Sequence, residues 1–225
     1  MEIAIINNQI AFFVSKPTDI VYEQLVLDIR KAIGEKFISP SIILPIPDDA
    51  PPEIPRVILE TFNKKIKITI AKNRCDFFYD YKNTSSNTKL DTKIIDYAEK
   101  LANVLDNKGF LFNRIGIVAK YFVLVKNPTE KIKESLTKLT DNDIVEISIR
   151  INRRKQYDSF SVNDVYTYDQ AIRANDKKHG ILITRDINTL HIEETILSPT
   201  EVNEFVKIVI EMINKEDPSG GLNNE

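Results

Sequence analysis

The chain has 225 residues, of which 42% are hydrophobic and 28% are charged, and its formal net charge is −2. This length supports a core large enough to fold without a metal or a disulfide, and the single cysteine, Cys75, cannot form an internal disulfide. The near-neutral charge excludes a surface that is basic throughout, so nucleic acid would need a local basic patch. No apolar stretch approaches the roughly 20 residues that cross a bilayer, and the first residues lack a secretory-signal pattern, which together predict a cytoplasmic location without membrane association.

The first third of the chain predicts a strand, a helix and a connector. Residues 2–14 are apolar and β-branched around Asn7 and Asn8, which predicts one bent strand or a small hairpin. Apolar residues then recur at every fourth position over residues 17–37, a spacing typical of an amphipathic helix, with Ser15 as its candidate N-cap. Six prolines between residues 39 and 55 predict a loop or an extended connector, because proline stops helices and removes ladder donors.

Three β-rich runs at residues 56–61, 65–70 and 75–81 are separated by short polar breaks, which predicts an antiparallel meander. After a polar loop, the apolar stripe over residues 94–105 predicts a second helix that ends at Gly109. The long run over residues 110–126 is apolar on both faces apart from a few polar positions, so we expect a strand at the centre of the sheet.

The last part of the chain predicts a short helix opened by Asn127 and Pro128, and then more strands. Strict alternation over residues 145–152 predicts a strand with one buried face, and two further strands are expected at about residues 159–168 and 180–190. The final helix has the clearest start signal, because Ser198, Pro199 and Glu201 match an N-cap, a first-turn proline and a capping box.

This order of elements predicts an α+β fold with a largely antiparallel sheet and about four helices packed on one side. We expect a single composite domain over residues 1–216. Two fused subdomains, 1–127 and 128–216, are the alternative, because each half holds a three-strand unit followed by a helix. Residues 217–225 are polar and contain glycine, which predicts a disordered tail.

No familiar catalytic, cofactor or metal motif is present. The chain has only six glycines and neither a GxxxxGK[ST] nor a GxGxxG loop. Its two histidines, His179 and His191, lie at opposite ends of one expected strand and would share a metal only if a hairpin formed near residues 185–188. The numerous carboxylates show no metal-binding spacing. We therefore expect no catalytic set, cofactor or metal, and an enzyme built from scattered carboxylates is the least favoured alternative.

One basic cluster stands out, and its members are Arg150, Arg153, Arg154 and Lys155, followed by Tyr157. Cations beside an aromatic ring can hold phosphates while the ring stacks on a base, so this cluster is the candidate nucleic-acid site. The commoner role of such residues is to protect a sheet edge from unwanted pairing.

Arg114 lies near the start of an otherwise buried strand, where a charged side chain must find a partner or reach solvent. It either pairs with an internal carboxylate or contacts an anionic ligand. The segment Asn113-Arg114-Ile115-Gly116, with the meander and helix before it, resembles a sporadically distributed family of uncharacterised bacterial proteins over about the first 125 residues. That resemblance implies no established activity and no catalytic residue.

The leading functional hypothesis is a non-enzymatic protein-interaction or assembly protein, acting as a subunit or accessory factor of a larger bacterial complex. Abundant strands with exposed edges and the lack of a catalytic set favour it, since edge strands are natural docking surfaces. A partner protein or self-association follows from this hypothesis. The alternative is a nucleic-acid-binding module that uses the basic cluster.

Overall fold

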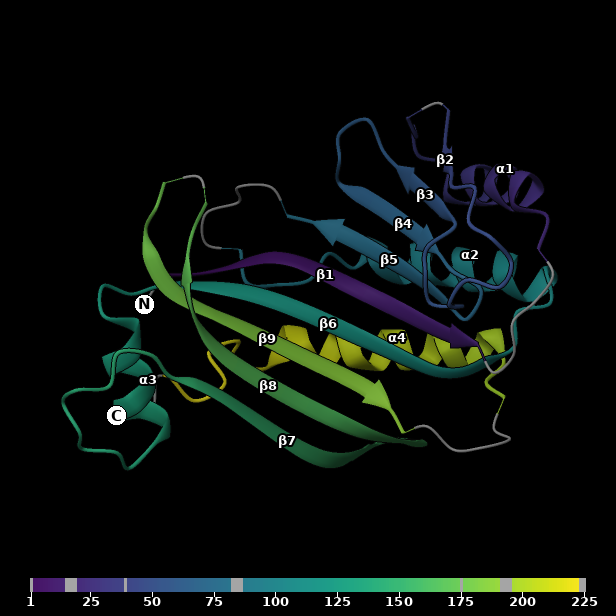
Figure 1. The fold of residues 1–225 in the computed structure, drawn as a ribbon. Coiled ribbons are helices and arrows are strands. Elements are labelled where there is room, and N and C mark those ends of the chain that lie inside the picture. The colour runs from purple at the N-terminus through teal and green to yellow at the C-terminus, as the bar shows by residue number, and fades with distance from the viewer. Residues whose placement is uncertain are drawn as a thin grey trace.

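The protein folds into one nine-stranded sheet with four helices packed against it, as a computed structural model shows (Figure 1). The structure describes residues 2–14, 20–38, 40–81, 87–174, 176–190 and 196–222. Every pair of neighbouring strands is antiparallel, which confirms the predicted α+β class. The strand order across the sheet is β2-β3-β4-β5-β1-β6-β9-β8-β7.

The elements fall into two sets along the chain. The first set is β1 (Glu2–Val14), α1 (Tyr22–Ile33), β2 (Ile42–Ile43), β3 (Val57–Glu60), β4 (Ile66–Ile70), β5 (Arg74–Asp80) and α2 (Lys93–Asn107). The second set is β6 (Phe112–Leu124), α3 (Pro128–Leu136), β7 (Ser148–Tyr157), β8 (Phe160–Ile172), β9 (His179–Thr189) and α4 (Pro199–Lys215). In the helices of the described chain, no segment is long and apolar enough to cross a membrane.

The two sets share one topology. In each, the first strand lies at the sheet centre, a helix leads to the outer edge, a meander returns toward the centre, and a final helix covers the sheet. The central strands β1 and β6 pair with each other over nearly their whole length, so one continuous sheet joins both halves. Residues at either side of this pair therefore share one core.

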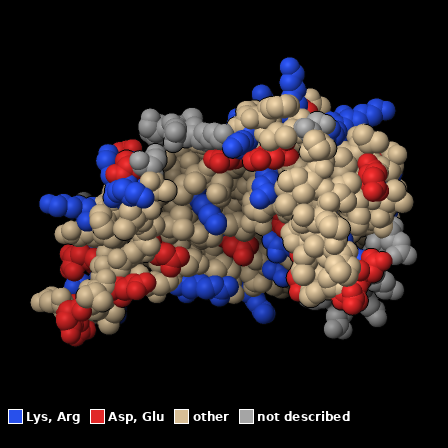
Figure 2. Space-filling view, turned by 45° about the horizontal axis from the view of Figure 1, so that its top comes forward, with Lys and Arg blue, Asp and Glu red and all other residues tan. Residues whose placement is uncertain are grey.

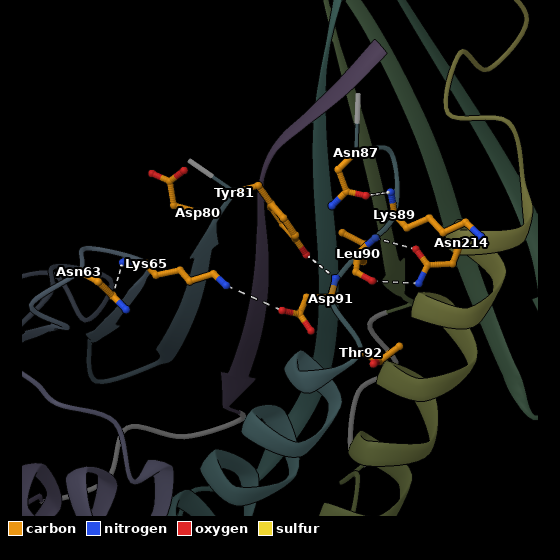
Figure 3. Close-up of a pocket in the computed structure, with 10 residues that line it drawn as sticks. All are labelled: Asn63, Lys65, Asp80, Tyr81, Asn87, Lys89, Leu90, Asp91, Thr92 and Asn214. Atoms are coloured by element: carbon orange, nitrogen blue, oxygen red, sulfur yellow. Dashed lines mark hydrogen bonds and ion pairs between the residues drawn. The ribbon is translucent and has the colours of Figure 1, made fainter. Parts of the chain in front are cut away.

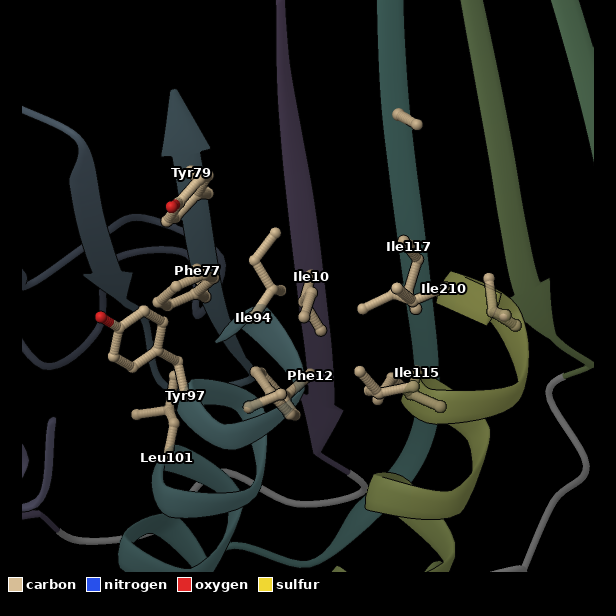
Figure 4. Close-up of a cluster of buried hydrophobic side chains, with 14 of the residues drawn as sticks. Ile10, Phe12, Phe77, Tyr79, Ile94, Tyr97, Leu101, Ile115, Ile117 and Ile210 are labelled. Carbon is tan, nitrogen blue, oxygen red and sulfur yellow. The ribbon is translucent and has the colours of Figure 1, made fainter. Parts of the chain in front are cut away.

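Helices α1, α2 and α4 lie side by side, and α2 and α4 run behind the sheet in Figure 1. Burial alternates along β4 and β5, and the strand register continues the same two faces across the sheet, so one set of side chains points at these helices and the other lies on an open face. Figure 4 shows Ile10 and Phe12 of β1 and Ile115 and Ile117 of β6 packed against Ile210 of α4 and the α2 side chains. All of these residues are at most 8% exposed.

Most local predictions are confirmed. The region 2–14 is one strand with a register shift between Ile5 and Asn7, and the meander, the central strand β6 and the capping box of α4 form as expected. Helix α1 is shorter than predicted and follows Val21, while the candidate N-cap Ser15 lies outside the described residues. The proline-rich segment holds only the two-residue strand β2.

Three expectations differ from the structure. Strand β7 begins at Ser148 and continues to Tyr157, whereas the prediction covered residues 145–152, and Val145 is 87% exposed. The hairpin that would have brought the histidines together is absent, because β9 is one continuous strand, and His191 lies outside the described residues. The expected disordered tail packs on the fold as far as Leu222, which is fully buried.

The packed tail depends on a close approach at Gly220. Its φ is 61°, and a Cβ atom there would lie 2.3 Å from the hydroxyl of Tyr168. The Gly220 carbonyl accepts a hydrogen bond from that hydroxyl at 2.7 Å, and the Leu222 carbonyl accepts one from Ser135 of α3 at 3.1 Å. Residues 217–222 therefore cover part of the second half of the sheet beside α3.

Candidate functional site

The open face of the sheet carries alternating charged, amide and apolar side chains. Register pairing and strand alternation place on it the cations Lys67, Arg74, Arg114, Lys120, Arg150 and Arg154, and the acids Glu60, Asp76, Asp80, Asp169 and Asp186. On the face that Figure 2 displays, cationic and anionic side chains are interspersed. A long polyanion on this face would therefore meet acidic as well as cationic side chains.

A row across the three central strands gathers two arginines around one ring. Phe13 of β1 is paired with Arg74 of β5 and with Arg114 of β6. Their guanidinium carbons lie 4.7 and 4.8 Å from the centre of the Phe13 ring, which is within cation–π range. Arg74 Nε also donates to Asp76 Oδ1 at 2.7 Å.

Arg114 therefore reaches the open face and stacks on Phe13. Among the residues that the structure describes, no carboxylate forms an ion pair with Arg114. Gly116, two residues later, faces the same way, and a Cβ atom there would lie 3.2 Å from the Cβ of Asn188 on β9. The neighbour that approaches Gly116 most closely is thus the Asn188 side chain.

The predicted basic cluster lies entirely on β7, but the strand divides it between two faces. Arg150 and Arg154 point to the open face, while Arg153, Lys155 and Tyr157 point to the helix-covered face. Lys155 Nζ and Tyr157 Oη both contact Asp164 Oδ2, at 2.6 and 3.0 Å. The five residues therefore lie on two faces of the strand, and Lys155 and Tyr157 are engaged with Asp164.

Asp164 is the centre of a buried ionic cluster that sequence reasoning missed. The carboxylate is 0% exposed and accepts two hydrogen bonds from Arg185, from Nε at 3.1 Å and from Nη2 at 2.9 Å. Arg185 also contacts Glu216 at 2.6 Å and stacks on Tyr166. The sequence does contain a signal for this cluster. Asp164 lies two residues from both Val162 and Tyr166, so in a strand its side chain lies on the same inner face as theirs.

The protonation of this cluster is fixed by its hydrogen bonds. Burial raises the pKa of Asp164, but the hydrogen bonds from Arg185 and Lys155 more than offset it, and the net pKa lies below the ordinary value. Burial lowers the pKa of Arg185, but its hydrogen bonds to Asp164 have the larger effect, so the net pKa of Arg185 is raised. Both oxygens of the Asp164 carboxylate accept hydrogen bonds from within the cluster, which points to a structural role.

The outer edge of β7 is the most distinctive unpaired feature. Tyr157 and Phe160 pair across the two-residue turn Asp158–Ser159, so the backbone groups of Tyr157 point toward β8. Because this direction alternates along an antiparallel strand, the N–H and C=O groups of Ser148, Arg150, Asn152, Arg154 and Gln156 point outward. In the part of the chain that the structure describes, no backbone hydrogen bond joins β7 to any segment except β8.

A cavity of about 660 Å³, lined mostly by polar residue types, lies where the end of β5, the start of α2 and the C-terminal part of α4 meet (Figure 3). The Asn214 side chain of α4 makes two hydrogen bonds to the backbone of Leu90. It donates to the Leu90 carbonyl at 3.1 Å and accepts from the Leu90 amide at 2.7 Å. Lys65 lies 3.9 Å from Asp91, and the Tyr81 hydroxyl accepts from the Asp91 amide at 2.8 Å. Most of the lining groups thus hold one another in place.

The cavity does not offer a carboxyl group tuned for acid–base chemistry. Burial raises the pKa of Asp91. The hydrogen bonds from Tyr79 and the Lys93 amide, together with the Lys65 charge, lower the pKa by more than burial raises it, so the net pKa lies below the ordinary value. A general acid near neutral pH needs the opposite shift. The second carboxylate, Asp80, is exposed at the rim.

The remaining candidate groups do not converge. Cys75 is buried in β5, and burial raises the pKa of its thiol well above the usual value, so the thiolate is disfavoured. His179 is exposed at the start of β9. Across the described ranges, no group of three or more histidine, cysteine or acidic side chains could hold a metal ion.

No protein-family model matches the chain, and no curated protein matches it.

Proposed function

We propose that this chain is a non-enzymatic protein-interaction or assembly protein that binds a partner by accepting one of its strands at the edge of β7. The observation that carries the proposal is the free outer edge of this strand, which spans ten residues and pairs with β8 alone in the described chain. An exposed edge of this length is a ready template for an extended segment of another chain. A subunit or accessory factor of a larger complex would bind in this way.

The chemistry of the candidate groups supports a binding role over catalysis. The carboxyl groups of Asp91, beside the cavity, and Asp164, buried under the sheet, both have a lowered pKa, and both are already hydrogen-bonded within the structure. The buried thiol of Cys75 is kept protonated by its surroundings. These groups stabilise the fold and leave binding to the surface.

Replacing Asn152 by proline is expected to abolish partner capture while leaving the chain folded. The Asn152 N–H points outward, so proline removes a donor that only the partner strand would use, and its ring projects into the space of that strand. The measurement is affinity capture from native cell extract by the tagged wild-type chain, Asn152→Ala and Asn152→Pro, after nuclease treatment. Circular dichroism and thermal unfolding check that all three are folded.

The alanine variant is the matched control, because it removes the same side chain and keeps the backbone donor. A discrete partner retained by the wild type and Asn152→Ala, and lost by Asn152→Pro, supports edge pairing. Equal capture by the folded proline variant would show that the partner binds elsewhere.

A nucleic-acid-binding module is the second candidate, and the row of Arg74, Phe13 and Arg114 favours it. The two guanidinium groups that Phe13 holds, with Lys120 on the same face of the sheet, could stack on bases and contact phosphates of a single strand. Under this alternative, Phe13→Ala and Arg114→Gln should each weaken binding of a single-stranded oligonucleotide. The salt slope should fall by about one for the arginine variant and stay unchanged for the alanine variant.

A further inference from the structure

The charges along β7 are uneven in a way that constrains its partner. The segment from Ser148 to Tyr157 contains four cations and no acid. Lys155 is held by Asp164 at 2.6 Å, but in the described chain Arg150, Arg153 and Arg154 form no ion pair, and all three are exposed. The free edge is therefore also an unneutralised cationic edge.

The strand geometry fixes where each free charge lies relative to an added strand. Arg150 and Arg154 project on the open face, four residues apart, and Arg153 projects on the helix-covered face. Ile151 lies on the same face as Arg153 and is half-buried against the core. A strand added beside β7 would continue this pattern, because side chains of paired residues lie on the same face.

A second copy of this chain fits the edge poorly. Two β7 strands would pair antiparallel about a two-fold axis, and the registers of greatest overlap are centred on Asn152 or on Arg153. The register centred on Asn152 places Arg150 of each copy opposite Arg154 of the other. The register centred on Arg153 places the Arg153 residues of the two copies opposite each other. Like charges directly opposite each other destabilise a strand pair.

Resting on the proposed strand addition, we infer that the partner is an acidic extended segment with a defined pattern. Antiparallel pairing is favoured because every pair in this sheet is antiparallel and such pairs are slightly more stable. Read from its N-terminus, the segment places acids opposite Arg154 and Arg153, any residue opposite Asn152, an apolar residue opposite Ile151 and an acid opposite Arg150. The sequence pattern is acid, acid, any, apolar, acid.

The test uses labelled peptides whose central residues are Glu-Glu-Thr-Val-Glu, with fluorescence anisotropy on the full chain. One control peptide replaces each Glu by Gln. The other is the isomer Val-Glu-Thr-Glu-Glu, which has the same charge but puts an acid opposite Ile151 in either strand direction. We expect the Gln peptide to bind about tenfold more weakly, from three opposite-charge pairs, and the isomer to bind more weakly than the parent peptide.

Replacing Arg150, Arg153 and Arg154 together by glutamine should remove the same tenfold preference, and Asn152→Pro should abolish binding of every peptide. Equal binding of the isomer, or binding of a single-stranded oligonucleotide in place of the peptides, would overturn the acidic-segment inference. If native-partner capture is lost with Asn152→Pro but unaffected by the triple glutamine variant, strand addition holds and the acidic partner does not. If Asn152→Pro leaves capture unchanged, the proposed function itself fails.

Discussion

Replacing Asp164 by asparagine is expected to lower the free energy of unfolding by about 3–5 kcal/mol, because Arg185 would remain buried without its bidentate partner. Arg185 keeps its contact with Glu216 at 2.6 Å, which places the expected loss toward the lower end of this range. Lys155 and Tyr157 lose the same acceptor. Urea unfolding followed by circular dichroism measures the change.

Asp96→Asn is the matched control, since Asp96 is an exposed aspartate of α2 whose only ion pair recorded in the described chain joins it to Lys100 at 2.8 Å. That variant should unfold almost as the wild type does, because exposed pairs contribute little. A wild-type-like Asp164→Asn protein would show that solvent reaches Arg185 and that the cluster is not a closed core element.

The same cluster predicts an acid-dependent part of stability. The folded-state pKa of Asp164 is lowered, so the carboxylate stabilises the fold above its unfolded pKa of about 3.9, and this contribution is lost as the pH falls through the folded value. The stability difference between wild type and Asp164→Asn should therefore be largest at neutral pH and should shrink below about pH 4. A difference that grows on acidification would contradict this assignment.

Local sequence signals were sufficient for most elements of the fold. The meander, both long helices and the capping box at Ser198 depend on residues close in sequence, and periodicity and turn chemistry predict them directly. The pairing of β1 with β6 joins residues from 98 positions apart (Val14 and Phe112) to 122 positions apart (Glu2 and Leu124). No local pattern encodes such a contact, so the sequence alone does not decide between one shared sheet and two subdomains.

The β7 region shows why the ends of strands and the arrangement of site residues were harder to predict from the sequence. Val145 continues the alternation of the strand, yet its carbonyl is held by the side chains of Thr129 and Gln170, and the strand begins only at Ser148. Sequence identified the cationic run from Arg150 to Lys155 but not its division between two faces. Lys155 turns inward because its partner, Asp164, lies across the hairpin on β8.

Replacing Phe12 by alanine is expected to lower the free energy of unfolding by about 3–5 kcal/mol. Phe12 is 0% exposed at the centre of the sheet (Figure 4), where β1 pairs with both β5 and β6. Its ring centre lies 6.0 Å from that of Phe112. The lost side chain would leave a cavity among residues that both halves contribute. Phe62→Ala is the control, since Phe62 is 69% exposed.

The shape of the unfolding curve also tests how the two halves are coupled. Because β1 belongs to the first half and pairs with β6 of the second over almost its full length, destabilising Phe12 should shift a single cooperative transition. Denaturation is followed by circular dichroism and by hydrogen exchange resolved over each half. If only the first set of elements, residues 2–107, lost protection while the second set, residues 112–215, kept it, the two halves would be separately stable despite their shared sheet.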